Sequence, residues 1–335
     1  MPHGLLPHLF YWEKAPVRVG ARFFSELKQS REIDVVLGAT DTEILLNDNL
    51  RTVQSIRLRS REKSTFTLDA KRFVLATGGL EVPRLLLASN EQITNGIGNA
   101  RDLVGRFHMD HPKNKDRKLA PRRALSLVLE AVKLHPRPCF GASFSLSYEV
   151  QRARGLPNHA LYLQPVIGRS GRIAHCIAKI GIEQSPNPDS RVYLAAERDV
   201  LGMPRLVVDW RFTPADHTGF EAVQRGLAQA VEAAGLGRLD FGERPLTLDE
   251  TMDASHHMGT TRMAADPSTG VVDPNCMVFG TENLYIASSA VFPTGHAYSP
   301  TFTILALARR LGHHLVEQHL RDLVPAQSGV DTVVA

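Results

Sequence analysis

The chain has 335 residues, of which 43% are hydrophobic and 22% are charged, so it can bury a substantial core and form two domains. Its formal net charge is only +4, and its basic residues are scattered among acidic ones, which argues against binding to nucleic acid or an anionic membrane. The three cysteines are widely spaced and predict neither a disulfide framework nor a Cys-x-x-Cys metal site.

The N-terminal residues 1–10 lack the basic leader and the long apolar core of a signal peptide, and no run of about 18 apolar residues predicts a membrane span. We therefore expect a cytoplasmic protein, unless a preceding segment carries an export signal. The densest basic cluster, residues 113–123, is flanked by prolines and lacks interleaved aromatic residues. We expect a solvated loop there and no nucleic-acid site.

Strand-like runs separated by turn residues fill residues 31–80 and predict a small β-meander that leads into a buried strand. The expected strands are 33–37, 42–46, 53–59, 65–68 and 73–76. The pattern is irregular after Pro112, and longer strand-like runs with turns between them follow. These runs are 139–148, 160–167, 173–183, 191–196 and 206–212, and together they predict an antiparallel sheet.

Two helices are predicted in the second half of the chain. The first opens at Thr213, which can cap it, while Pro214 fits the first turn and Asp216 favours the positive helix end. Its apolar stripe consists of Phe220, Val223, Leu227 and Val231, and Gly235 and Gly237 supply a stop. The second helix spans 302–320, with apolar positions at Ile304, Leu307, Leu311 and Leu315.

The loop before the second helix carries Ser299 as an acceptable N-cap and Pro300 at the first helical position. A helix N-terminus leaves unpaired N–H groups and a partial positive charge, so it favours a phosphate or a reduced cofactor ring in front of it. From these residues alone, a capped helix packed on a core is the alternative interpretation.

Several motifs stand in a fixed order near the C-terminus: His-x-x-Gly-Thr at 256–260, Val-Val-Asp-Pro at 271–274, Asn-Leu-Tyr-Ile at 283–286 and Phe-Pro-Thr at 292–294. Their order and spacing resemble the C-terminal signature of the glucose-methanol-choline (GMC) oxidoreductases, flavoenzymes that oxidise alcohols. Further segments resemble the same family: 73–89, a strand, Gly turn and helix; 104–112, with Val-Gly-Arg and Met-Asp-His-Pro; and 183–192 with 199–204, a substrate-domain hairpin.

The resemblance implies an α+β / α/β fold in which a partial FAD-binding domain is interrupted by a substrate domain with an antiparallel sheet and flanking helices. The domains expected are 1–115, the middle part of the FAD-binding domain; 116–250, the substrate domain; 251–322, the C-terminal part of the FAD-binding domain; and 323–335, a tail. Members of the family open with a Gly-x-Gly-x-x-Gly turn that holds the ADP half of FAD, and this chain has none. We therefore expect the C-terminal portion of a longer flavoprotein, with a separately encoded N-terminal region as a possible partner.

The activity implied by the resemblance is FAD-dependent oxidation of an alcohol group on a sugar, a polyol or another primary or secondary alcohol. A base removes the hydroxyl proton while hydride passes to flavin N5, and the motif assigns the base role to His256, with His257 at a variable position. The residues expected to bind the cofactor are Val36, Thr77, Gly78, Gly79, Ala287, Ser288, Pro300 and Thr301. The resemblance fixes neither the particular alcohol nor the electron acceptor.

The chain departs from the family pattern at two places. Ser299 stands where the family has Asn or His, and because serine cannot act as a base of suitable pKa, His296 becomes the candidate to help position the substrate. Residues 287–289 replace the Asp-Gly of many relatives, so hydroxyl or backbone groups would contact the cofactor there.

Two other interpretations stay open. The segment 108–111, with two histidines and an aspartate, has the residue types of zinc ligands when combined with His256, His257 or His296, as in a metal-dependent hydrolase. The flavoprotein resemblance explains the surrounding residues better, so we expect no metal site. The other alternative is a non-catalytic or incomplete half of a GMC flavoprotein, suggested by the missing turn and by Ser299.

Overall fold

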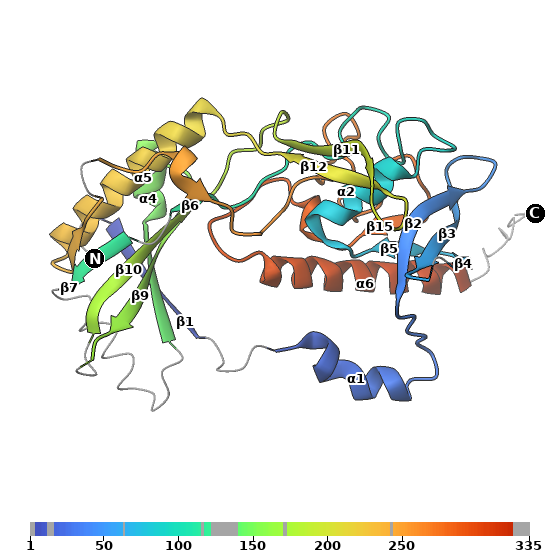
Figure 1. Cartoon of the computed structure of the whole chain (residues 1–335), viewed down its shortest axis with the longest axis horizontal. Helices are drawn as coiled ribbons and strands as arrows, with labels where there is room; N and C mark the ends of the chain where they lie inside the picture. The colour runs from blue at the N-terminus through green and yellow to red at the C-terminus, as the bar shows by residue number, and fades with distance from the viewer. Residues whose placement is uncertain are drawn as a thin grey trace, which may run out of the picture.

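The computed structural model describes residues 4–11, 17–62, 64–114, 117–121, 140–169, 173–241 and 244–323. Within them the chain forms two bodies that lie side by side (Figure 1). One body is built on a large antiparallel sheet, and the other surrounds a short pair of parallel strands with helices on both faces. The mixed α+β / α/β architecture expected from the sequence is confirmed.

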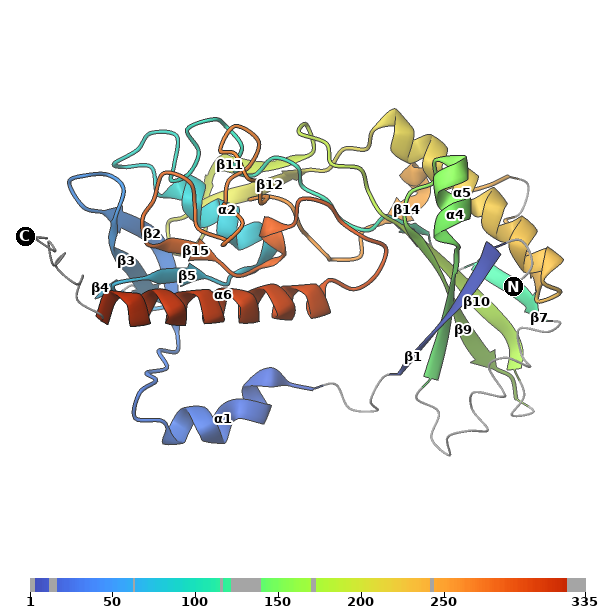
Figure 2. The same cartoon turned by 180° about the vertical axis from the view of Figure 1, so that it is seen from behind.

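The large sheet has the order β1-β8-β9-β10-β6-β14, with β7 and β13 joined to it beside β10, and its described strand pairs are antiparallel. Its strands are β1 (Leu5–Tyr11), β6 (Lys113–Asn114), β7 (Arg117–Pro121), β8 (Phe140–Leu146), β9 (His159–Ile167), β10 (Ile173–Ile182), β13 (Gly237–Leu239) and β14 (Thr251–Met252). Helices α4 (Tyr148–Arg154) and α5 (Pro214–Ala233) lie together on one side of the sheet (Figures 1 and 2). The core between sheet and helix includes Leu5, Phe144, Leu161, Ile180, Phe220 and Leu227.

In the second body, strands β5 (Phe73–Leu75) and β15 (Leu284–Ile286) pair in parallel. Helix α2 (Gly78–Ala88) lies on one face of this pair and α6 (Thr301–Leu323) on the other (Figures 1 and 2). The meander is formed by β2 (Ala39–Leu46), β3 (Val53–Ser60) and β4 (Thr65–Asp69), and the hairpin of β11 (Arg191–Arg198) and β12 (Pro204–Asp209) packs against α2.

The two cores divide the chain differently from the domain boundaries expected at residues 115 and 250. Strand β1 lies in the large sheet, where Leu5 pairs with Leu146, although it precedes the meander in sequence. The hairpin β11–β12 packs on α2 in the other body, although it falls inside 116–250. Both differences arise from pairing between segments far apart in the chain, which local patterns do not reveal.

Two local expectations are corrected by the structure. Residues 33–37 form no strand: Ile33, Val35 and Leu37 are exposed, and a β-branched run needs a neighbouring strand to become one. The basic stretch 113–123, expected as a loop, contains β6 and β7. Cys139, residues 115–116, residues 122–123 and the tail beyond 323 lie outside the described residues.

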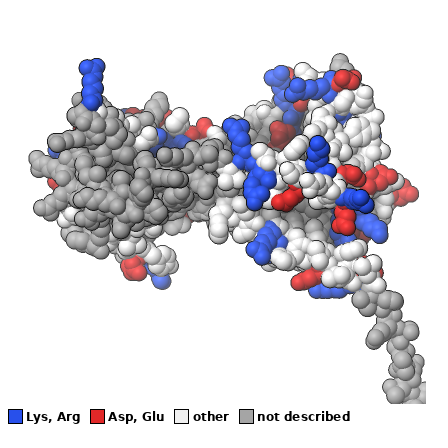
Figure 3. Space-filling model, turned by 90° about the horizontal axis from the view of Figure 1, so that it is seen from below, with Lys and Arg blue, Asp and Glu red and all other residues white. Residues whose placement is uncertain are grey.

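Surface charge on the described residues is mixed in sign. Figure 3 shows Lys and Arg side chains interspersed with Asp and Glu on the body that is not drawn in grey. In the part of the chain that the structure describes, no helix is both long enough and apolar enough to span a bilayer.

Helix α5 begins as the sequence predicts. Thr213 Oγ1 accepts from the backbone N–H of Asp216 at 3.2 Å, and the Asp216 carboxylate accepts from the N–H of Thr213 at 2.7 Å, which completes a capping box. The same carboxylate also accepts from the N–H of Ser185 at 2.8 Å. Asp216 is buried, so it joins the helix to the segment that follows β10.

Replacing Asp216 with alanine leaves buried N–H groups unpaired and should lower the free energy of unfolding by about 2 kcal/mol. Urea unfolding followed by circular dichroism measures this loss. The exposed Glu232 near the end of the same helix is the control, and Glu232→Ala should change stability by no more than about 0.5 kcal/mol. Equal effects of the two substitutions would contradict the assigned role of Asp216.

Candidate functional site

The loop that carries His256 and His257 is fixed by contacts from two other segments. A Cβ atom at Gly79, in the first turn of α2, would lie 2.2 Å from the carbonyl oxygen of His257, so only glycine fits there. The hydroxyl of Ser289 donates to this carbonyl oxygen at 2.7 Å. Thr260 Oγ1 donates to the carbonyl oxygen of Gly79 at 2.6 Å, so the loop and the start of α2 form one rigid unit.

The segment 105–111 runs between the hairpin β11–β12 and this histidine loop and pairs with both. On the hairpin side, the N–H of His108 donates to the carbonyl oxygen of Ser190 at 2.8 Å, and Ser190 Oγ donates to that of His108 at 2.7 Å. On the other side, Met109 and Met258 exchange backbone hydrogen bonds of 2.9 and 3.0 Å. The pairing brings residues 108–111 against the histidine loop.

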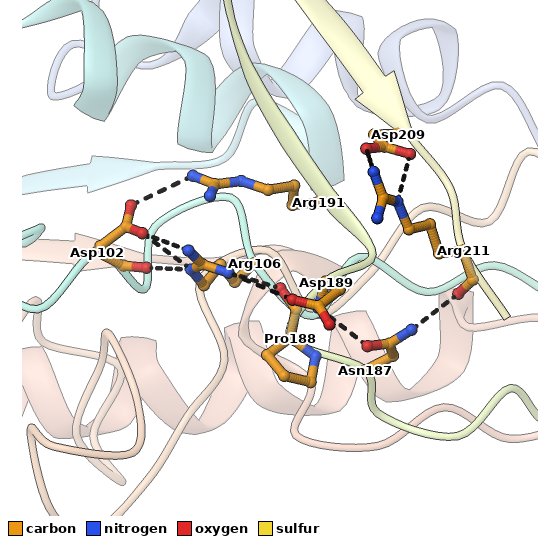
Figure 4. Close-up of polar contacts among 8 residues, drawn as sticks. All are labelled: Asp102, Arg106, Asn187, Pro188, Asp189, Arg191, Asp209 and Arg211. Atoms are coloured by element: carbon orange, nitrogen blue, oxygen red, sulfur yellow. Dashed lines mark hydrogen bonds and ion pairs between the residues drawn. The ribbon is translucent and has the colours of Figure 1, made fainter. Parts of the chain in front are cut away.

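A network of charged side chains reinforces the entry to this segment (Figure 4). Asp102 accepts from Arg106 and, at 3.2 Å, from Arg191 Nη2. Arg106 also donates from Nη1 to the carbonyl oxygen of Pro188 at 3.1 Å. Because these groups are partly exposed, each ion pair adds little energy, but the network holds residues 102–106 against the start of β11.

Two groups of histidines meet at the end of the segment. His257 Nδ1 lies 3.4 Å from a carboxylate oxygen of Asp110 and 3.3 Å from His108 Nε2, so the His257 ring faces a buried polar pair. The His111 ring lies between two other imidazoles, with centroid distances of 5.2 Å to His256 and 5.7 Å to His296.

The second histidine group contains buried nitrogen atoms without partners. His111 is only 4% exposed, and its ring nitrogens make no well-formed hydrogen bond to the described residues, although the backbone of Tyr298 lies near enough to raise its pKa. His256 Nδ1 likewise has no partner among the described residues. His296 Nδ1 accepts from the N–H of Tyr298 at 3.0 Å, which leaves Nε2 as its other polar atom. Buried polar atoms are usually satisfied, so these nitrogens mark a place where a polar molecule would bind.

Burial and mutual repulsion hold these imidazoles in the neutral form. Burial, followed by the charge of His257, lowers the pKa of His108 to about 4. Burial, followed by His256 and His296, lowers the pKa of His111 to about 3. Burial is also the largest cause of the lowered pKa values of His256 and His296. Neutral imidazoles can accept a proton at neutral pH.

The residues expected around the flavin lie at one edge of the parallel strand pair. Thr77 and Gly78 follow β5, Ala287 and Ser288 follow β15, and the carboxyl ends of parallel strands share an edge. Gly78 has a φ of +88°, with no heavy atom within 4 Å of a Cβ placed there. Thr77 makes no side-chain cap to α2, so the first amides of that helix are available to an anion.

The start of α6 differs by one residue from expectation. The helix begins at Thr301, and the carbonyl oxygen of Pro300 accepts from the N–H of Ile304 at 3.0 Å, so Pro300 occupies the cap position before the helix. Ser299 is exposed, and its Oγ lies 3.4 Å from Thr301 Oγ1.

Val36 lies away from this set of residues. It is 53% exposed in the extended stretch between α1 (Val19–Gln29) and β2, which runs below α6 in Figure 1. The structure therefore does not bring Val36 to the histidine loop.

Asp110 and His111 are site residues to which the family pattern assigned no role. The sequence pointed to Asp110 and His111 only through the residue types of 108–111, which resemble zinc ligands. The metal-dependent hydrolase interpretation grouped them with His256, His257 or His296. The structure does bring these side chains together. Nevertheless, no three His, Cys, Asp or Glu side chains among the described residues are arranged to hold a metal ion. Cys176 and Cys276 are buried free thiols.

The buried histidines make the stability of the chain depend on pH. The pKa values of His108 and His111 lie below the ordinary value of 6.5, so the folded protein binds fewer protons than the unfolded one. Their stabilisation is present above about pH 6.5 and is lost as the pH falls toward 4 for His108 and toward 3 for His111, by about 2 kcal/mol for each histidine at pH 5. Urea unfolding across this range measures the loss.

In the same experiment, His108→Asn and His111→Asn should each reduce the slope of stability against pH, whatever their effect at neutral pH. His319 lies exposed on α6, and His319→Asn should leave the slope unchanged. A slope that stays the same in all three variants would contradict the assignment of neutral buried imidazoles.

Comparison with known proteins finds similarity to sugar oxidoreductases. Residues 186–308 match the family model described as GMC oxidoreductase. The chain is 24% identical over 314 residues to a C-glycoside 3-oxidase of Arthrobacter globiformis, covering 90% of this chain and 56% of the relative. It is 25% identical to the large subunit of fructose dehydrogenase of Gluconobacter japonicus, covering 78% of this chain and 50% of the relative. The chain thus spans about half the length of these curated relatives.

Solved structures share the fold. The crystal structure of a formate oxidase superposes with a TM-score of 0.65 at 18% identity, covering 89% of this chain and 63% of that one. Pyridoxine 4-oxidase from Mesorbium loti gives a TM-score of 0.62 at 20% identity, covering 87% of this chain and 59% of that one. The family match over residues 186–308 and the fold shared with these structures support a C-terminal portion of a GMC oxidoreductase.

Proposed function

We propose that this chain supplies the substrate side of an FAD-dependent oxidoreductase that oxidises an alcohol group, and that His256 takes the hydroxyl proton. The observation that carries the proposal is the group of neutral imidazoles at His256, His111 and His296. The loop that holds His256 packs through the His257 carbonyl against Gly79 at the start of α2. The relatives named above are a C-glycoside 3-oxidase and a fructose dehydrogenase, which supports a sugar or polyol as the substrate class.

The two neighbouring histidines of the loop have different surroundings. The His257 ring is engaged with Asp110 and His108. The His256 ring faces His111, and its Nδ1 has no partner among the described residues. Because a base needs a free nitrogen, we assign proton acceptance to His256, whose Nδ1 has no partner, and not to His257, whose Nδ1 faces Asp110 and His108.

The residues present also fit FAD. Gly78 leaves open space before the first amides of α2, and Ser288 and Ala287 stand at the same edge. Pro300 and Thr301 begin α6, whose N-terminus favours negative charge. When bound there, FAD would accept the hydride from the alcohol carbon, while the chain's own residues orient the alcohol and remove its proton.

His296 is better placed than Ser299 to provide the second polar group. Its ring is near His111, whereas Ser299 is exposed beside Thr301. A hydrogen bond from His296 Nε2 would position the substrate oxygen against His256. This supports the interpretation that an imidazole replaces the family's residue at 299.

A second candidate is that the chain is an incomplete half of a flavoprotein and needs a separate N-terminal region. In the part of the chain that the structure describes, the free edge of the β5–β15 pair and the exposed apolar face of α6 favour it. Among the described residues, β5 pairs only with β15, whereas parallel sheets normally continue and are covered on both faces. Helix α6 exposes Phe302 (83%) and Leu305 (62%), which line a surface hollow of about 570 Å³. We infer that a region with the Gly-x-Gly-x-x-Gly turn adds a strand to β5 and covers this face of α6.

The first test concerns the cofactor. The chain alone should purify without stoichiometric FAD, because no turn cradles the pyrophosphate, and a region that supplies this turn should restore binding. Flavin absorbance per mole of protein measures occupancy. Leu305→Asp should weaken the recovery, whereas Glu317→Ala, at an exposed polar position of α6, should not. Near-complete flavin occupancy in this chain alone would contradict the proposed need for an N-terminal region. Bound zinc without flavin would favour the metal-dependent hydrolase.

In the flavin-loaded enzyme, His256→Ala should lower the rate of alcohol oxidation at least about a hundredfold, the scale expected for the loss of a general base. Flavin content should stay unchanged, and His257→Ala should have a much smaller effect. Steady-state rates with a sugar or polyol measure the difference. If His257 proved the more sensitive residue, the assignment of the base would have to be abandoned.

A further inference from the structure

Asp110 has a buried carboxylate surrounded by backbone N–H groups from two segments. It is only 1% exposed. Its Oδ1 accepts from the N–H of Ala254 at 3.0 Å, and its two oxygens accept from the N–H of His256 at 3.2 and 3.1 Å. The N–H of His111 also donates to Oδ1, at 2.6 Å. A single side chain thus holds the backbone of the base and of the imidazole beside it.

The position of this carboxylate is itself fixed. The N–H of Asp110 donates to Oε1 of the buried Gln184 at 3.1 Å. Gln184 Oε1 also accepts from Trp210 Nε1 at 2.7 Å, and its Nε2 donates to the carbonyl oxygen of Arg211 at 3.0 Å. The chain before Asp110 is held by the Met109–Met258 pairing, so the carboxylate has little freedom to move.

We propose that Asp110 is a positioning residue, whose buried carboxylate holds the loop of residues 254–256 and places the His256 imidazole in its working position. The inference rests on the proposed function, because it concerns the base of that same site. A carboxylate that accepts three backbone N–H groups is satisfied in a buried site without a full ion pair, and it confers rigidity on the loop.

The charge of Asp110 also acts on the His256 ring. Burial lowers the pKa of His256, Asp110 raises it, and Lys113 and His257 lower it. Among the described residues, the rings of His111 and His296 also lie near His256, and Asp253 and His108 act on the neighbouring His257. Removing the negative charge should therefore lower the pKa of His256 further, whereas a residue that merely fills space would leave it unchanged.

The test uses the full chain without cofactor, with histidine side chains titrated by NMR and the His256 signal identified by its loss in His256→Gln. Asp110→Asn keeps an acceptor oxygen but removes the charge, and should move the His256 titration to lower pH. The control is Asp273→Asn, which removes the charge of another turn-capping aspartate, one that accepts from Asn275 and Met277. This control should leave the titration in place.

Hydrogen exchange at the amides of residues 254 and 256 provides a second measurement. Asp110→Glu retains the charge but shifts the carboxylate, so it should speed the exchange of both amides while changing the His256 titration less than Asp110→Asn. This variant keeps the inference testable if Asp110→Asn does not fold. In the flavin-loaded enzyme, either substitution should lower kcat about tenfold or more, as expected for a misplaced base.

An unchanged His256 titration in Asp110→Asn, or an equal shift in Asp273→Asn, would overturn the inference. Unchanged amide exchange in Asp110→Glu would also overturn it. These readouts require neither flavin nor alcohol. The failure of Asp110 to position His256 is therefore distinguishable from a failure of the proposed alcohol oxidation, which would appear only in the loaded enzyme.

Discussion

The backbone pairing of Met109 with Met258 is the contact on which the rest of the candidate site depends. It joins the segment 105–111 to the histidine loop, while Ser190 fixes the same segment from the side of the hairpin. Without it, the Asp110 carboxylate would not reach the amides of the loop, and the His111 ring would not lie beside that of His256. The site is therefore assembled by main-chain hydrogen bonds, and side-chain chemistry is added to a scaffold that is already positioned.

Two opposing electrostatic effects set the protonation state of His256, the proposed base. Burial keeps the imidazoles neutral, and each neighbouring histidine makes the protonation of the next less favourable. Asp110 acts in the opposite direction on His256. A buried carboxylate beside neutral imidazoles supports a proton acceptor that is ready at neutral pH and can hold the proton once it is transferred.

Features set by local sequence were predictable, and features set by distant pairing were not. The capping box of α5 and the meander β2–β4 follow from neighbouring residues, and the structure confirms both. Strand β1 could not be placed, because its partner β8 lies more than a hundred residues away. The run at 33–37 was wrongly assigned as a strand, because strand propensity indicates a strand only where a partner exists. For the site, motif resemblance indicated His256, but the role of Asp110 emerges only when residues 110 and 256 are brought together.

The most direct measurement of the central claim is the anaerobic reduction of the flavin in the completed enzyme. The oxidised protein is mixed rapidly with a sugar or polyol, and the absorbance of oxidised flavin is followed during a single turnover. The account predicts that the absorbance falls with the parent chain and falls far more slowly when His256 is replaced by alanine. Reduction at equal rates in the two proteins would contradict the assignment of the base, and a folded, flavin-loaded enzyme that no alcohol reduces would contradict the proposed function.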